Sequence, residues 1–336
     1  MPHRIARIYD PARFQSEGRR GGWFEGWYFK LTGADGAHPI AIIPGVSHAP
    51  DANDSHSFVQ VIRPGGSVHY HRFPYDAFAF DPDRFEVRVG PNVFSAEGLK
   101  VDLPSDGEHA LRGQVEFGPW TGWPVSALSP GVMGWYRFVP RMECYHGALS
   151  FDHSLRGTLL HGDQTLEFAG GRGYAEKDWG TSFPSSWIWA QSNHFDVPET
   201  IGSGPSLFLS VARIPWMGSS FTGHIAGLLL DGEVVRFATY TGSHLIHVAT
   251  GGGAAQVLLR DRRRELSVEV SGAVTGELKA PVQGAMVGRA NEGLDAQVVV
   301  ELRELRGGRA GVVFSGRGSG AGVEIMNALG ELSADV

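Results

Sequence analysis

Short apolar runs separated by turn residues recur along the whole chain, and they restrict the folds that it can adopt. Runs such as Leu111–Phe117, Ser206–Arg213 and Gln297–Leu305 are bounded by Gly, Pro or Asp, and 47 glycines are spread from end to end. A short helix fits only in the tail or in the Trp- and Pro-rich segment 118–140, which we expect to be a long ordered loop. Short strands at near-regular spacing are typical of sandwiches and barrels. The pattern predicts an all-β protein with little helix.

The length of the chain indicates two domains, since 336 residues is long for one. A break near Gly162–Gly170 separates two sets of strand-like runs. We therefore expect an N-terminal β domain over residues 1–165 and a C-terminal β domain over residues 166–336.

The composition of the chain limits the kinds of molecule it can bind and the compartment it fits. A net charge of −7 argues against nucleic acid, which needs a basic face. Cys144 is the only cysteine, so no intrachain disulfide forms, which fits a reducing compartment. The first residues lack the apolar core of a signal peptide, and no apolar run approaches the length of a membrane span. We expect a cytoplasmic protein. A peripheral contact with a membrane and the oligomeric state are left open.

The stretch Gly171–Asp196 concentrates aromatic and ionisable residues. Two runs, Arg172–Trp179 and Trp187–Phe195, flank the turn-forming sequence GTSFPSS, which predicts a hairpin or a strand pair with a longer loop. Because side chains alternate along a strand, two groups share faces. On the first run these are Tyr174, Glu176 and Asp178, opposite Lys177 and Trp179; on the second they are Trp187, Trp189, Gln191 and Asn193. The acids and this aromatic-amide wall are expected to meet across one sheet.

Two earlier strands show the same alternation. In the run 23–30, one face carries Trp23, Glu25, Trp27 and Phe29, and the other carries Phe24, Tyr28 and Lys30. In the run 56–62, one face carries His56, Phe58, Gln60 and Ile62.

The carboxyl groups are the candidate acids. Burial in an aromatic site disfavours the charged form and raises the pKa of a carboxyl group, so Glu176 or Asp178 could hold a transferable proton near neutral pH. The alternative is a structural ion pair with Lys177 or a nearby Arg. Glu25, between Trp23 and Trp27, follows the same logic. The tryptophans are either core residues or the walls of a site, where their ring faces would attract a cation.

Other chemistries find little support. His69 and His71 share a strand face, but two imidazoles are too few for a closed metal site. A solvated or hydrogen-bonded pair is the stronger interpretation, and no metal is expected. No phosphate-binding loop or GxSxG nucleophile motif is present.

The central stretch resembles the signature of the tocopherol cyclase family. The matching positions are Gly173, Tyr174, Glu176, Lys177, Trp179, Gly180, Phe183, Pro184, Trp187, Trp189, Gln191 and Asn193. The block Trp23–Lys30 resembles the family's N-terminal signature, and His56–Ile62 and Gly320–Ile325 fit less specifically. One departure is Asp178, where plant-type members usually carry Asn. The resemblance implies two lipocalin-like antiparallel β-barrels in tandem, with the acidic and Trp-rich signature in the second.

The resemblance also implies an activity. Such an enzyme protonates the alkene of a prenylated hydroquinone and closes a chromanol ring, an isomerisation that needs no cofactor. Glu176, Asp178 and Glu25 are then the candidate catalytic residues. The implied substrate-binding residues are Trp23, Trp27, Tyr28, Phe58, Gln60, Tyr174, Trp179, Trp187, Trp189, Gln191 and Asn193. Two alternatives stay open: a hydratase that admits water to the same cation, and a lipocalin-like carrier of a hydrophobic small molecule.

Overall fold

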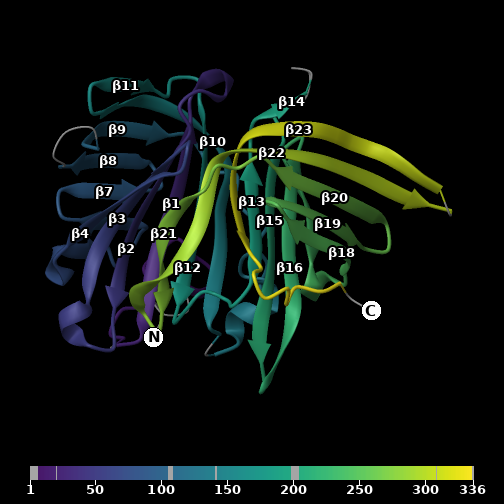
Figure 1. Ribbon diagram of the computed structural model, residues 1–336, viewed down its shortest axis with the longest axis horizontal. Coiled ribbons are helices and arrows are strands. Elements are labelled where there is room, and N and C mark those ends of the chain that lie inside the picture. The colour runs from purple at the N-terminus through teal and green to yellow at the C-terminus, as the bar shows by residue number, and fades with distance from the viewer. Residues whose placement is uncertain are drawn as a thin grey trace. The chain divides into compact units, whose positions relative to one another are not determined.

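The computed structural model describes residues 7–19, 21–104, 109–140, 142–197, 204–307 and 309–334. These residues form strands β1 to β23 and five short 3₁₀ helices, which confirms the all-β prediction (Figure 1). The 3₁₀ helices are η1 (Ala34–Gly36), η2 (Ala52–Asp54), η3 (Tyr75–Ala77), η4 (Gly134–Phe138) and η5 (Thr239–Thr241). Within the described part of the chain, no helix has the length and apolar character needed to cross a membrane.

The first sheet is antiparallel and has the strand order β4-β3-β2-β1-β12-β10-β9-β8-β7-β6-β5, with β11 paired to β10. Its strands are β1 (Trp23–Thr32), β2 (Ile40–His48), β3 (His56–Arg63), β4 (Ser67–Phe73), β5 (Phe78–Phe80), β6 (Glu86–Val89), β7 (Asn92–Ser95), β8 (Gly98–Leu103), β9 (Leu111–Phe117), β10 (Cys144–His161), β11 (Gln164–Glu167) and β12 (Arg172–Gly180).

The first sheet curls around one apolar core. Val59 on β3 and Val87 on β6 lie toward opposite ends of the strand order, yet both belong to the same buried cluster. Trp27 and Phe29 of β1 and Ala175 of β12 lie in this cluster as well. The sheet therefore bends back on itself, as the antiparallel barrel prediction requires.

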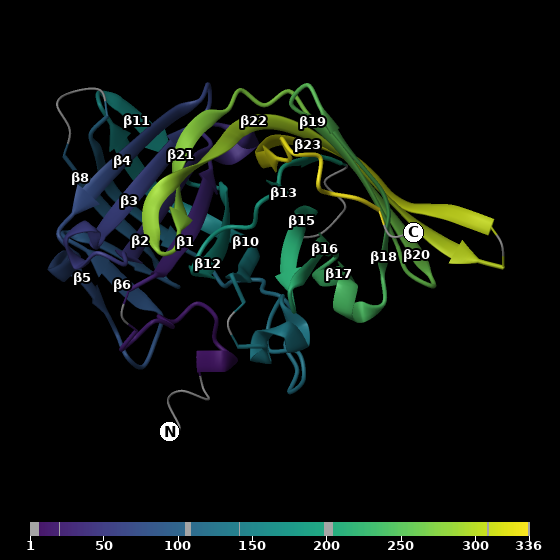
Figure 2. The same cartoon turned by 60° about the horizontal axis from the view of Figure 1, so that its bottom comes forward.

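The second sheet is also antiparallel, with the order β17-β16-β15-β13-β23-β22-β20-β19-β18; β14 pairs with β23 and β21 pairs with β22. Its strands are β13 (Trp187–Ser192), β14 (Phe195–Asp196), β15 (Ser206–Trp216), β16 (Ser219–Leu230), β17 (Glu233–Ala238), β18 (His244–Gly251), β19 (Ala254–Arg260), β20 (Arg264–Ser271), β21 (Gly276–Val282), β22 (Ala285–Arg306) and β23 (Arg309–Met326). The two longest, β22 and β23, form a curved hairpin (Figure 2).

The second sheet has its own core. Phe237 on β17 and Leu245 on β18 come from the two ends of the strand order and share one buried cluster. Ile188 and Ala190 of β13 contribute to the same cluster. This sheet is curled as well, so the prediction of two curled antiparallel sheets holds for both parts of the chain.

The division into compact units differs from the expected domains 1–165 and 166–336. The first unit comprises residues 1–63, 67–183 and 277–289, and the second comprises residues 64–66, 184–276 and 290–336. The reason is that β12 lies between β1 and β10 in the middle of the first sheet. The Glu176–Asp178 segment therefore belongs to the first unit.

The predicted pairing of the two runs in the central stretch is wrong. β12 pairs with β1 and β10, whereas β13 pairs with β15 and β23. The GTSFPSS segment therefore connects two sheets and does not close a hairpin. The acids and the Trp187–Asn193 wall do not share one sheet, and each is described below within its own unit.

Candidate functional site

Strand β12 is buried on both faces, and the two faces carry different chemistry. Ala175 lies in the apolar core of the first unit, and Lys177 and Trp179 share its face. Tyr174, Glu176 and Asp178 lie on the opposite face, as the alternation predicted. A strand with two buried faces loses the simple alternation of apolar and polar residues, because both sets of side chains are removed from water.

An array of two acids, an imidazole and a phenol occupies the face of Glu176. His146 lies on β10 directly opposite Asp178, and its Nδ1 is 2.6 Å from Asp178 Oδ1. Its Nε2 is 3.6 Å from Glu176 Oε2. The hydroxyl of Tyr174 donates a hydrogen bond to the same Glu176 oxygen at 2.5 Å. The imidazole of His146 thus lies between the two carboxyl groups, and the hydroxyl of Tyr174 bonds the more buried one, that of Glu176.

The surroundings keep the neighbouring donors protonated. Burial and the adjacent Glu176 raise the pKa of Tyr174 well above its ordinary value. Burial and the adjacent Asp178 raise the pKa of the Cys144 thiol, whose Sγ is 3.7 Å from Asp178 Oδ1. The Glu176 side chain is only 6% exposed, whereas that of Asp178 is 25% exposed. The array therefore runs from a buried carboxyl group through an imidazole to a carboxyl group that solvent reaches.

His146 is the residue that the sequence analysis missed. It lies about thirty positions before the acids, and only the β10–β12 register places it beside Asp178. Period-2 alternation assigns faces within one strand, but it does not say which strands are neighbours.

The same three residues could hold a cation. One ligand atom each from His146, Glu176 and Asp178 lies within 4.8 Å of the others, and no other set of three such groups does so in the searched part of the chain. An imidazole nitrogen with two carboxylate oxygens would suit Zn²⁺ or a similar ion. The 2.6 Å contact between His146 and Asp178 has the length of a charge-assisted hydrogen bond, so a metal would compete with a proton for the same atoms.

Glu25, one of the candidate acids, forms a buried ion pair on the opposite face. Its Oε1 lies 2.5 Å from Lys177 Nζ, and both side chains are fully buried. The backbone N–H groups of Gln15 and Ser16 donate to its two oxygens. Burial lowers the pKa of Lys177 to about 8, although Glu25 acts to raise it. Lys177 is therefore paired with Glu25, and not with Glu176 or Asp178, which lie on the other face beside His146.

Trp27, one of the implied substrate-binding residues, belongs to the apolar core of the first unit and lies on the face opposite Glu176. It lies opposite Lys177 in the β1–β12 register, on the core face, and its indole N–H donates to the Ala12 carbonyl at 2.7 Å. Trp179 stacks on Tyr145 at 5.6 Å on this same face. Trp23 is buried beneath the Arg19 guanidinium, 3.7 Å from its ring centre. These three rings pack against cations of the protein.

The face of Glu176 does gather three other predicted residues. Tyr28 lies opposite Glu176 in the register, and its ring meets that of Tyr174 edge-on at 6.4 Å. Phe58 reaches this face from β3, where its ring lies across Gly45; a Cβ at that glycine would be 2.4 Å from the ring. The glycine therefore makes room for the aromatic ring.

Gln60 lies on this face too, but its amide is already occupied. Its Nε2 donates to the carbonyl of Lys279 at 3.1 Å, and its Oε1 accepts from the N–H of Lys279 at 2.9 Å. Both polar atoms of Gln60, one of the implied substrate-binding residues, are thus used within the protein. Gln60 instead attaches β21 within the first unit.

In the second unit, Trp187, Trp189 and Gln191 lie on the buried face of β13 that points away from the core residues Ile188 and Ala190. The indole N–H of Trp187 donates to Glu324 Oε2 at 2.5 Å. Asn193 is buried just past the strand end, where its Oδ1 accepts from His194 Nδ1 at 2.9 Å.

The sequence analysis also missed two carboxyl groups in the second unit, of Glu292, which is buried, and of Glu324, which is half-buried. Glu324 on β23 lies opposite Glu292 on β22 and also opposite Trp189 on β13. Both acids come from the C-terminal quarter of the chain, and only strand pairing brings them beside the tryptophans. They are a second place where an acid meets aromatic rings.

The profile of the tocopherol cyclase-like family matches residues 103–326, more than half of the chain. A probable chloroplastic tocopherol cyclase of Oryza sativa subsp. japonica is 26% identical over 194 residues, which is 50% of this chain and 39% of the rice protein. A chloroplastic tocopherol cyclase of Zea mays is 25% identical over 127 residues, 37% of this chain and 26% of the maize protein. The matched region thus spans well under half of these relatives.

Among solved structures, the complex of CghA with Sch210972 matches with a TM-score of 0.54 and 12% identity, covering 90% of this chain and 88% of that one. A second crystal structure of CghA matches with the same TM-score of 0.54, at 13% identity. At this level of identity the likeness concerns the fold, and it agrees with the two curled sheets described above.

Proposed function

The chain belongs to the tocopherol cyclase-like family, and on that premise we propose that it is an acid catalyst that closes a chromanol-type ring on a prenylated hydroquinone or a similar isoprenoid. The observation that carries the proposal is the array Tyr174–Glu176–His146–Asp178 on the face of β12 that points away from the core. It places a buried acid 3.6 Å from an imidazole that is hydrogen-bonded to a second, more exposed acid.

In the proposed reaction Glu176 donates its proton to the less substituted carbon of the prenyl alkene. The alkene electron pair forms the new C–H bond and leaves a tertiary cation on the neighbouring carbon. The phenol oxygen of the substrate attacks this cation, and a C–O bond closes the ring. The phenol then loses its proton, so one proton is consumed and one is released.

His146 and Asp178 return the proton to Glu176. The imidazole accepts a proton on one nitrogen and releases one from the other, which suits a group between two carboxyl groups. Asp178, the more exposed acid, exchanges protons with solvent. Glu176 stays secluded, as a donor to a carbon atom needs, since water would otherwise capture the cation.

The aromatic residues near the array are proposed to contact the apolar part of the substrate. Tyr28, Tyr174 and Phe58 share the face of Glu176, and ring faces stabilise a nearby cation by about 0.5–2 kcal/mol. Trp187, Trp189, Gln191 and Asn193 stay proposed ligand-binding residues within their own unit. The reaction calls for a proton and no redox cofactor, since substrate and product are isomers.

The test is conversion of a prenyl benzoquinol to its chromanol by the purified chain. Glu176→Gln keeps the shape of the side chain and removes the proton, so we expect the rate to fall about 10²–10⁴-fold. His146→Asn should also lower the rate and change its pH profile, because it interrupts the return of the proton. Glu324→Gln, which removes a half-buried acid of the second unit, is the control and should retain turnover.

Isotope and metal experiments sharpen this test. Turnover in deuterated water should place deuterium on the carbon next to the new C–O bond. A chelator should leave the rate unchanged, and Zn²⁺ should lower it by occupying the atoms that carry the proton. A tertiary alcohol as product would favour a hydratase, and binding without turnover in every variant would favour a carrier. Loss of turnover in Glu324→Gln alone would move the acid to the second unit.

A further inference from the structure

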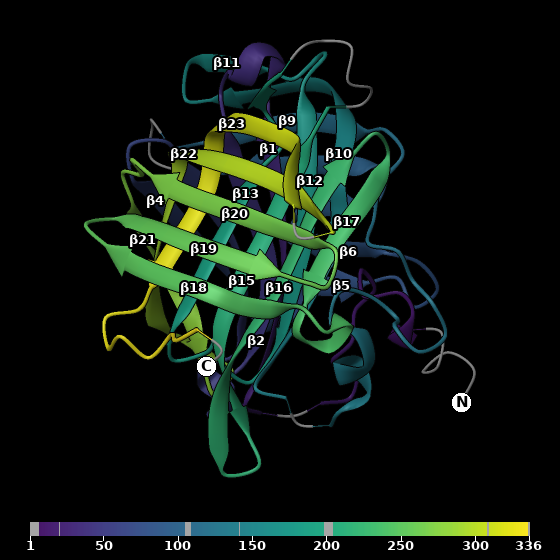
Figure 3. The same ribbon diagram turned by 90° about the vertical axis from the view of Figure 1, so that its right-hand side faces the viewer.

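The hairpin β15–β16 runs beyond the sheet to which it belongs (Figures 1 and 3). Pairing of β15 with β13 ends at Ala212, and pairing of β16 with β17 ends at Ile225. The two strands nevertheless continue to pair with each other out to Trp216 and Ser219. Residues 214–221 therefore form a two-stranded ribbon that neither neighbouring strand accompanies. A ribbon of this kind is stable only marginally in water by itself.

The ribbon carries no charge and several large apolar side chains. Between Ile214 and Phe221 the sequence is IPWMGSSF, without a Lys, Arg, Asp or Glu. Met217 at the turn is 92% exposed, and Trp216 lies beside it with its ring edge-on to Phe221 at 6.3 Å. Exposed strands are ordinarily protected from association by charged side chains.

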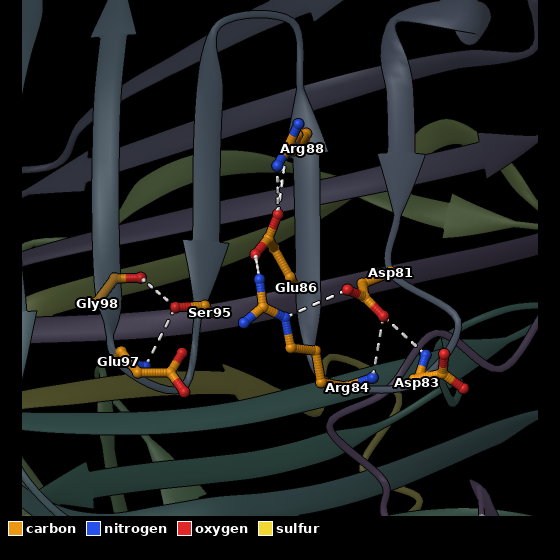
Figure 4. A network of polar contacts seen from close by, with 8 residues as sticks. All are labelled: Asp81, Asp83, Arg84, Glu86, Arg88, Ser95, Glu97 and Gly98. Carbon is orange, nitrogen blue, oxygen red and sulfur yellow. Dashed lines mark hydrogen bonds and ion pairs between the residues drawn. The ribbon is translucent and has the colours of Figure 1, made fainter.

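Charged side chains do gather at β6, a strand that is paired on both edges, and at the turn before it. On β6, Glu86 accepts from Arg84 and from Arg88, each at 2.6 Å, and Arg84 also pairs with Asp81 at 3.2 Å (Figure 4). The lack of charged residues in 214–221 is therefore a local property of the ribbon and does not extend to the other strands of the chain.

The turn residue itself is unusual for its backbone. Met217 and Gly218 have φ values of 48° and 82°, positive at both central positions as in a type I′ turn. Such turns favour Asn, Asp or Gly first, because a side chain is strained at positive φ. Elsewhere the chain follows this rule at the β16–β17 turn, where Asp231 precedes Gly232 in the same conformation. Turn geometry does not account for Met217.

We propose that the tip of the β15–β16 ribbon inserts into the interfacial layer of a lipid bilayer. Trp suits this layer because its ring is apolar and its N–H is polar, and Met adds an apolar side chain that is otherwise left in water. The choice of a bilayer as partner rests on the proposed function, because a prenylated quinol dissolves in lipid.

Flotation of the full chain with phosphatidylcholine vesicles tests the proposal. Met217→Asn removes the apolar side chain and supplies a residue that the turn prefers, so the fold is retained. We expect partitioning to weaken about tenfold, as the loss of one buried apolar side chain predicts. Asp231→Asn, in the same type of turn at the other end of β16, is the matched control and should partition like the wild type. Brominated lipids should quench Trp fluorescence less in Trp216→Phe than in the wild type.

The salt dependence and the state of association give further outcomes. Binding should persist at about 1 M salt, where the Debye length is about 3 Å, because the tip is uncharged. Loss of binding in salt would assign it to an arginine surface and overturn the proposal. The proposal would also be overturned if Met217→Asn partitioned as strongly as the wild type. It would likewise be overturned if the wild type did not bind vesicles but formed a dimer that Met217→Asn dissociates.

Activity measurements separate this proposal from the proposed function. With detergent-dispersed quinol, Met217→Asn should turn over at the wild-type rate, and with vesicle-embedded quinol it should be slower. Absence of turnover in both formats, with normal flotation, would reject the cyclase and retain the lipid contact. Equal rates in both formats, with no flotation, would reject the lipid contact and retain the cyclase.

Discussion

Neighbouring residues of β12 have opposite roles because they lie on opposite faces. Lys177 forms a fully buried ion pair with Glu25, which also accepts two backbone N–H groups. Removal of one partner of such a pair leaves a buried charge and is strongly destabilising. Glu176, one position away, shares its face with His146 and Tyr174. The signature Glu-Lys-Asp thus combines one structural cation with two acids of the candidate site.

His153 is a second buried ionisable residue, and it makes stability depend on pH. Its ring lies over Gly173, where a Cβ would be 2.2 Å from Nε2, and contacts Phe117 at 4.7 Å. Burial lowers the pKa of His153 from 6.5 to about 3. Between these values the unfolded chain binds a proton that the folded chain does not, so stability falls as pH falls from 6.5 toward 3.

We predict that His153→Gln removes this part of the pH dependence. One proton contributes about 1.4 kcal/mol per pH unit, so the stability advantage of the wild type over the variant should shrink by about 3 kcal/mol between pH 7 and pH 4. Urea unfolding at both pH values measures it. His247→Gln, at an exposed position, is the control. A constant difference between wild type and His153→Gln would show that the imidazole titrates normally in the folded state.

At the scale of elements, β21 shows how a side chain can take the place of strand pairing. Both polar atoms of the Gln60 amide bond the main chain of Lys279, as a backbone neighbour would. The Ser47 hydroxyl donates to the Gly284 carbonyl at 2.6 Å just beyond. These contacts attach residues 277–289 to the first unit, more than 200 positions from Gln60 in sequence.

We predict that Gln60→Ala loosens β21 selectively. The change leaves the N–H and C=O of Lys279 without these partners, and unpaired buried polar groups cost about 1–3 kcal/mol. Amide hydrogen exchange over residues 276–289 should accelerate, while exchange in β12 stays slow. Gln114→Ala, at an exposed position of β9, should change neither. Unchanged exchange in β21 would mean that Gln60 does not secure it.

At the scale of the whole molecule, neither unit is a continuous piece of chain. The first contains residues 1–63, 67–183 and 277–289, and the long strand β22 begins in the first unit and continues in the second. A single cut therefore separates neither unit cleanly. The central position of β12 between β1 and β10 makes the location of a cut decisive.

We predict that the fragment 1–183 folds and the fragment 1–165 does not. The shorter fragment lacks β12, which pairs with both β1 and β10. Without it, the edges of β1 and β10 that face each other in the middle of the sheet have no partner strand. Far-UV circular dichroism and urea unfolding should show a cooperative transition for 1–183 and none for 1–165. Equal cooperativity of both fragments would mean that β12 is dispensable for the first sheet.

The sequence by itself determined the all-β class, the alternation along β12 and the placement of Tyr174, Glu176 and Asp178 on one face. These properties are local, because the backbone of an extended chain sets the period of two whatever its neighbours are. The tertiary structure alone decided that β12 pairs with β10, so that His146 meets both acids, and that Glu25 neutralises Lys177. It also separated β12 from β13 into different sheets, against the expected hairpin. Strand partners are chosen by the burial of surfaces far apart in sequence, and a turn-rich linker such as GTSFPSS fits a tight return and a crossing between sheets equally well.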